Sequence, residues 1–208
     1  KSELAVHLGW NYDVMKNQNA NGSVFVSELQ PRIVFQWSQV WSPRWQTYVA
    51  LENHFLSYTD PNTPGKELRT KSMITTESKL GARHSLSQKL NLETTSGLDE
   101  AHYFLQTSED VFEIQKDLVP FLDLTAEMSI VKKQPFVLSF LLQSRIYAGG
   151  QKVFNGGNVN GAGFSLSQSK HDKGLRGSIL YQAGTLDVAD FKIDYQSYDF
   201  MFSYKWDF

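Results

Sequence analysis

The chain ends with Tyr198-Asp-Phe-Met-Phe-Ser-Tyr-Lys-Trp-Asp-Phe208, in which every second side chain from Phe200 onward is aromatic. Successive side chains of an extended strand point to opposite faces, so this segment has one aromatic face and one polar face. The two faces must contact very different surroundings. The segment therefore predicts a β-strand that lies between an apolar and a polar environment.

The same alternation recurs along the whole chain. In the first strand, Leu4, Val6 and Leu8 share one face, while Glu3 and His7 share the other. About ten antiparallel strands are predicted, at residues 3–14, 24–40, 45–58, 71–86, 89–97, 112–130, 136–148, 159–168, 175–184 and 198–208. Residues 98–112 fit either one external loop or two further short strands, which would make about twelve.

One proline falls inside a predicted strand. Pro31 lies in the segment 24–40, and proline cannot donate a backbone hydrogen bond to a neighbouring strand. We therefore expect a bulge at this position.

Packing decides which face of the strands is inside. A sandwich would bury the apolar face, but a barrel of about ten strands encloses little more than its own inner side chains and cannot hold so many aromatic residues. Most of the predicted strands are much longer than the usual length of about five or six residues. The pattern therefore favours an all-β, transmembrane, up-and-down barrel with its apolar face toward lipid.

Composition narrows the chemistry. The 208 residues fit a single domain, 1–208, and include no cysteine, which excludes disulfides and thiolate metal sites. The 20 basic and 22 acidic residues give a formal charge of -2 with no basic run, so no nucleic-acid partner is expected. The chain also opens at Lys1 directly into a strand, which leads us to expect a removed signal peptide or an upstream domain.

The strand pattern and the final aromatic residue resemble bacterial outer-membrane β-barrels, in which the last strand is read by the insertion machinery. The resemblance implies a multi-pass protein of a Gram-negative outer membrane, with short periplasmic turns, longer extracellular loops and both termini periplasmic. It implies as partners outer-membrane lipid, lipopolysaccharide and the barrel insertion machinery, and periplasmic or membrane proteins if the barrel belongs to a larger assembly. The expected interface girdle and insertion signal are Trp10, Tyr12, Trp41, Trp45, Tyr204, Trp206 and Phe208.

The other strand face carries charges of both signs. The residues predicted to line the lumen are Glu3, His7, Arg32, Glu52, His54, Glu77, Lys79, Arg83, Lys89, Glu93, Asp123, Glu127, Arg145 and Lys205. Charged groups are costly to bury unless they are paired, so a network of ion pairs is expected in a narrow barrel. No metal site and no cofactor is expected.

Three functions remain open. The leading one is passive: a narrow, porin-like polar channel for transport or a translocation barrel, either of which could be the membrane part of a larger assembly. The second is a non-conducting structural or surface-recognition barrel. The third is an outer-membrane hydrolase with His54, beside Glu52 and Asp13, as a rim base. We expect no catalysis, because the paired acidic residues and Asp-His of the ten-stranded omptin proteases are not recognisable here.

Overall fold

The computed structural model describes residues 1–17, 24–27, 29–59, 67–68, 72–108, 111–133, 135–149, 154–170, 173–188 and 191–207. Within these residues, no helix is long and apolar enough to cross a membrane.

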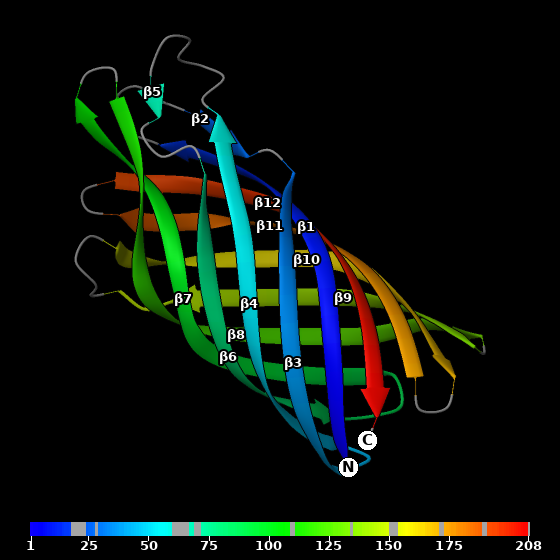
Figure 1. Cartoon of the computed structure of the whole chain (residues 1–208). Coiled ribbons are helices and arrows are strands. Elements are labelled where there is room, and N and C mark those ends of the chain that lie inside the picture. The colour runs from blue at the N-terminus through cyan, green and yellow to red at the C-terminus, as the bar shows by residue number, and fades with distance from the viewer. Residues whose placement is uncertain are drawn as a thin grey trace.

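The described residues form one closed antiparallel barrel of ten strands with one extra short strand (Figure 1). The elements are β1 (Ser2–Asn17), β2 (Val24–Ser27), β3 (Gln30–Ser42), β4 (Trp45–Thr59), β5 (Glu67–Leu68), β6 (Ser72–Ser85), β7 (Leu90–Ser108), β8 (Val111–Lys133), β9 (Phe136–Tyr147), β10 (Phe154–Lys170), β11 (Lys173–Val188) and β12 (Phe191–Asp207). β2 and β3 together form the second barrel strand, since both pair with β1 and β4. β5 is the extra strand and lies parallel to β8.

The last strand closes the barrel against the first. β12 pairs with β1 from Glu3↔Asp207 to Asn17↔Ile193, and every intervening residue has a partner. The predicted aromatic strand is therefore a seam strand that leaves no free edge between β1 and β12.

Two sequence predictions are corrected in detail. Residues 98–112, which we expected as a loop or as two extra strands, extend β7 and β8 into one long hairpin, with Leu98 opposite Pro120 and Gln106 opposite Phe112. The barrel thus has ten strands, not twelve. The irregularity expected at Pro31 lies just before it: the pairing register shifts by one residue between Val14↔Val26 and Asn11↔Gln30, whereas Pro31 itself pairs with Trp10.

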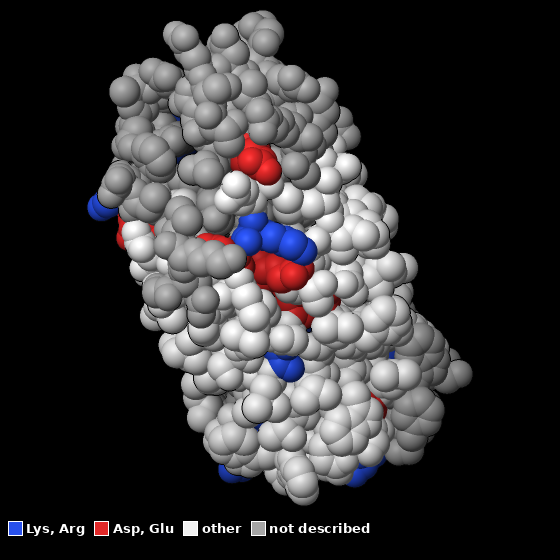
Figure 2. Space-filling view, turned by 60° about the vertical axis from the view of Figure 1, so that its left-hand side comes forward, with Lys and Arg blue, Asp and Glu red and all other residues white. Residues whose placement is uncertain are grey.

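The outer face is apolar, as the alternation predicted. In the view of Figure 2, uncharged residues cover most of the described surface, and a patch of mixed charge lies toward the upper end. Large apolar side chains that remain exposed occur on every long barrel strand, among them Leu8, Phe35, Leu51, Leu80, Leu98, Leu124, Leu142, Phe164, Ile179 and Phe202. Soluble proteins rarely expose so continuous an apolar surface, whereas a barrel in lipid requires it.

The predicted girdle residues lie at different heights. Trp41 and Trp45 flank the β3–β4 turn at the end that holds both termini, and Trp45 stacks on His84 at 4.1 Å between ring centroids. Trp10 and Tyr12 lie farther along β1, and Tyr12 continues into a row with Tyr198 and Tyr181 on the next two strands. These last two tyrosines extend the predicted set.

The remaining girdle residues lie at the end of β12. Tyr204 is half-buried and pairs with Val6 of β1. Trp206 belongs to β12, but its side chain is outside the described set, and Phe208 lies outside the described residues.

Introducing a charged residue on the outer face tests whether that face contacts lipid. Leu122→Arg, near the middle of β8, should destabilise the barrel by about 2–4 kcal/mol in a bilayer, because a guanidinium in hydrocarbon loses its hydration. Leu86→Arg, in the exposed turn between β6 and β7, should cost about 0–1 kcal/mol. Urea unfolding of barrels refolded into vesicles measures both, and equal losses would contradict a lipid-facing β8.

Candidate functional site in the barrel lumen

Arg145 forms the centre of a layer of ion pairs at mid-height in the lumen. From β9, its guanidinium donates to both carboxylate oxygens of Glu77 at 2.9 and 3.0 Å, and to Asp123 at 2.8 and 2.6 Å. Tyr147 donates to Asp99 at 3.1 Å, and its hydroxyl accepts a bond from Arg145 at 3.2 Å. Two bidentate contacts hold the guanidinium in one orientation.

The layer continues through Lys79 and Glu52. The Lys79 ammonium lies 2.7 Å from Glu77 and 2.6 Å from Glu52. Glu52 also pairs with Arg32 at 3.1 Å, and Arg32 reaches Asp199 of β12 at 3.5 Å. Each charge therefore has an opposite partner, the condition under which burial of ions is tolerated.

The connected groups bridge the lumen. The pair Arg145–Glu77 joins β9 to β6 across the two intervening strands, and Arg32–Asp199 joins β3 to β12 across β1. The layer takes members from β12, β3, β4, β6, β7, β8 and β9, which together cover most of the circumference. Its ion pairs therefore span the lumen between several walls of the barrel.

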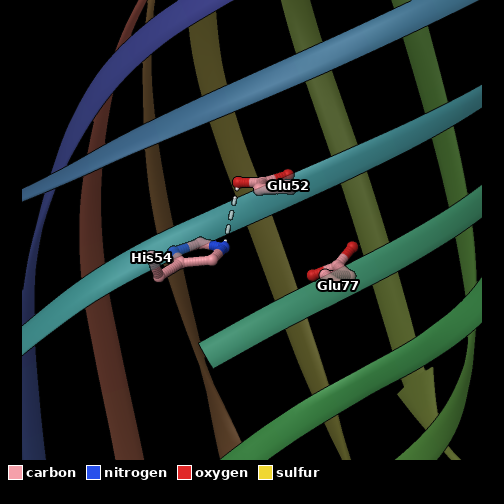
Figure 3. Close-up of side chains that lie close together, drawn as sticks. All are labelled: Glu52, His54 and Glu77. Atoms are coloured by element: carbon pink, nitrogen blue, oxygen red, sulfur yellow. Dashed lines mark ion pairs between the residues drawn. The ribbon is translucent and has the colours of Figure 1, made fainter. Parts of the chain in front are cut away.

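A group with metal-ligand spacing lies inside this layer. Ligand atoms of Glu52, His54 and Glu77 all lie within 4.8 Å of one another. Figure 3 shows them on the adjacent strands β4 and β6, with His54 turned toward Glu52, to which its Nε2 lies at 3.0 Å. The two carboxylates already hold the Lys79 ammonium, so the arrangement fits an ion-pair network better than a cation site.

A hydrogen-bonded cluster lies nearer the upper end. The carboxylate of Asp13 accepts bonds from the Tyr58 hydroxyl at 2.9 Å, from the Tyr195 hydroxyl at 3.2 Å and from Asn11 at 3.0 Å. His102 contacts the Tyr58 hydroxyl at 2.5 Å. His102 lies in the segment 98–112, for which the sequence allowed a loop or two short strands; it belongs to β7, and the long hairpin carries it into the lumen.

Above this cluster the lumen becomes apolar, whereas the residues predicted to line it are all charged or histidine. Buried apolar side chains from strands around the barrel fill it: Met15, Phe25, Leu56, Tyr58, Ala101, Ile114, Val119, Phe154, Val159, Leu186, Val188 and Ile193. We call this group the apolar cap. The sequence did contain a signal for this change. In β4, Leu56 and Tyr58 continue the series of alternate residues that begins with the inward-facing Glu52 and His54, so they should face inward as well.

Three cavities follow one another along the lumen. The upper one, of about 260 Å³, lies between the apolar cap and the ion-pair layer, and a middle one of about 260 Å³ shares Glu52 and Lys79 with it. The lowest, of about 430 Å³, shares His7 and Glu127 with the middle cavity. We call it the lower chamber; Glu3 and Lys205, near the chain termini, contribute to its wall.

The middle cavity depends on a glycine. A Cβ on Gly81 would lie 2.2 Å from the Tyr48 ring, so only glycine leaves room for the ring beside it. Tyr48 crosses to β7, where its hydroxyl bonds to Glu93 at 2.7 Å and contacts Thr95. The Tyr48 side chain thus lines the middle cavity, between the lower chamber and the ion-pair layer.

Twelve of the fourteen residues predicted to line the lumen border these cavities: Glu3, His7, Arg32, Glu52, His54, Glu77, Lys79, Arg83, Glu93, Glu127, Arg145 and Lys205. Asp123 is buried against Arg145. Lys89 is exposed in the turn between β6 and β7, where side chains no longer alternate between the lumen and the outer face. Sequence reasoning missed Asp99, Arg176 and Asp199 as lumen groups, although strand parity could have found Arg176 and Asp199.

No protein-family model matches the chain, and no curated protein matches it. Solved structures do. The outer-membrane protease OmpT from Escherichia coli is 12% identical with a TM-score of 0.57, covering 100% of this chain and 96% of that one. The β domain of the Bordetella autotransporter Brka is 9% identical (TM-score 0.57, 100% of each chain). An outer-membrane channel from Pseudomonas putida F1 is 9% identical (TM-score 0.53, 100% and 95%).

The closed barrel, its apolar outer face and these similarities define the class: the chain has the fold of a bacterial outer-membrane β-barrel. The three matched proteins bear different descriptions, as a protease, an autotransporter domain and a channel. The fold therefore does not select among functions, whereas the residues that line the lumen can.

The ion-pair layer should be the most sensitive part of the lumen. Arg145→Met should destabilise the barrel by about 3–5 kcal/mol, because Glu77 and Asp123 lose their shared guanidinium while buried. Arg44→Met, at an exposed turn, should cost less than about 0.5 kcal/mol. Urea midpoints of the refolded proteins measure the difference, and a loss below about 1 kcal/mol for Arg145→Met would show that water screens these pairs.

Proposed function

We propose that the chain is an outer-membrane barrel that provides a narrow polar channel, constricted in this conformation by the ion-pair layer. The observation that carries this proposal is the succession of three cavities along the lumen, neighbours sharing wall residues such as Glu52 and Glu127. Charged groups on opposite walls of a narrow lumen select solutes by size and charge. The similarity to a channel supports the fold on which such a lumen is built.

The proposed orientation places both termini in the periplasm. Both termini lie at one end of the barrel, together with the short β3–β4 and β6–β7 turns (Figure 1). In this orientation the lower chamber faces the periplasm and the apolar cap faces outward. Lipid and lipopolysaccharide would contact the outer face, and the insertion machinery would contact the strand that ends the barrel.

A second function is favoured by the apolar cap. Buried apolar side chains such as Phe25, Phe154 and Val188 pack together at the upper end of the described lumen. A barrel that never conducts would serve as a structural or surface-recognition element. A channel would instead require these side chains to move.

We also propose that the barrel acts without catalysis. Glu52, the carboxylate beside His54, is bound to Arg32 and Lys79 as well. A carboxylate shared among three cationic or imidazole groups is typical of a structural network. Loss of a hydrolytic activity in His54→Ala, with the barrel folded, would favour a hydrolase instead.

Bilayer recordings distinguish the channel from the non-conducting barrel. The refolded protein should give small discrete conductance steps, and Glu77→Ser/Arg145→Ser should raise them at least twofold, because both long side chains leave the constriction. Glu100→Ser/Lys116→Ser removes an ion pair whose side chains are 30% and 41% exposed, and should change nothing. A folded protein that stays silent, with a silent lumen variant, would contradict the channel and favour the second function.

A further inference from the structure

The lower chamber carries more positive than negative charge. Its wall holds three cationic side chains, Arg83, Arg176 and Lys205, against two carboxylates, Glu3 and Glu127. Lys205 pairs with Glu3 at 2.8 Å. Glu127 is therefore the one chamber carboxylate, within the described residues, that both arginines contact.

Glu127 is saturated, whereas the two guanidiniums are not. One of its oxygens accepts bonds from Arg83 and from Arg176 at 3.4 Å. The other accepts from Ser165 at 3.2 Å and lies 3.3 Å from Arg176. A guanidinium has five N–H donors in a planar fork, so both arginines keep donors for another acceptor. Both side chains are 31% exposed, which leaves these donors accessible from the lumen.

The arginines approach from opposite walls. Arg83 lies on β6 and Arg176 on β11, which are diametrically opposite in the ring of ten strands. His7 stands beside Arg176, since His7 and Arg176 both pair with Ser203 of the strand between them. All three side chains line both the lower chamber and the middle cavity, so they lie where the two cavities meet.

His7 supplies a polar atom that lacks a protein partner. Its Nδ1 contacts the Ser203 hydroxyl at 2.7 Å, while its Nε2 is buried without a hydrogen-bond partner among the described residues. His7 lines both the lower chamber and the middle cavity. A buried polar atom without a partner is costly, and a bound ligand or water would satisfy it.

We propose that the lower chamber binds a small oxyanion, a solute bearing a phosphate or carboxylate group, between Arg83, Arg176 and His7. Two forked guanidiniums match the oxygens of such groups better than they match a spherical ion. Glu127 holds the arginines in place when the solute is absent. This site would define the class of solute for the proposed channel. Only passage of the solute through the barrel rests on the proposed function; binding in the lower chamber does not.

The test is an equilibrium titration of the refolded barrel with inorganic phosphate. The ionic strength is kept constant with chloride, and the ¹⁵N resonances of the His7 ring, assigned with His7→Gln, report occupancy. We expect a saturable shift with a dissociation constant in about the millimolar range. Arg83→Gln/Arg176→Gln should weaken binding at least tenfold. Glu127→Gln should tighten it, because both guanidiniums lose the negative charge that they share in the empty chamber.

Arg44→Gln removes one exposed positive charge outside the lumen and should leave the titration unchanged. Acetate in place of phosphate distinguishes a carboxylate preference from a phosphate preference. No saturable shift with either anion, in a barrel shown to be folded by its gel mobility before and after heating, would overturn the site. An unchanged phosphate dissociation constant in Arg83→Gln/Arg176→Gln, compared with the unsubstituted barrel, would also overturn the site.

The anion site and the channel can be contradicted independently of each other. A barrel that binds phosphate but stays silent in bilayers keeps the anion site and loses the channel. A barrel that conducts without binding either anion keeps the channel and loses the site.

Discussion

The structure depends on pairing of backbone hydrogen-bonding groups at the seam between the first and last strands. In hydrocarbon an unpaired N–H or C=O costs several kcal/mol, so only a sheet without edges spans a membrane with strands. β1 and β12 meet this requirement through continuous pairing from Glu3↔Asp207 to Asn17↔Ile193. The outer apolar face, the buried charges and the narrow lumen all follow from this closure, because it fixes which face of each strand is inside.

Closure at ten strands makes the interior small, and its contents change along the axis. The lower chamber is polar and has excess positive charge, the middle holds the Arg145–Glu77 layer, and the upper end is filled by the apolar cap. Alternation alone does not produce this order. It arises because successive inward positions of one strand, such as Glu52, His54 and Leu56, change from charged to apolar with height.

The alternation of polar and apolar residues predicted most of the fold, because neighbouring residues of a barrel strand point alternately into the lumen and out toward lipid. Residues such as Glu77 and Arg145 could be assigned to the lumen from parity, but their pairing could not be, since they are 68 residues apart and three strands distant. The long hairpin was missed because the outward charges Glu100 and Lys116 break the apolar pattern, although they pair with each other at 2.9 Å.

The most direct test of the account is a cross-link across the closing seam. The chain has no cysteine, so Leu8→Cys/Phe202→Cys introduces the sole pair of thiols, at positions directly opposite on β1 and β12. Directly opposite residues of antiparallel strands lie about 4.5–5.5 Å apart at Cα, within reach of a disulfide. We expect Leu8→Cys/Phe202→Cys to oxidise rapidly in the folded barrel to a circular form, and the register-shifted Leu8→Cys/Phe200→Cys to oxidise slowly. Equal rates in the two variants, or no cross-link in either, would contradict a closed barrel with this register.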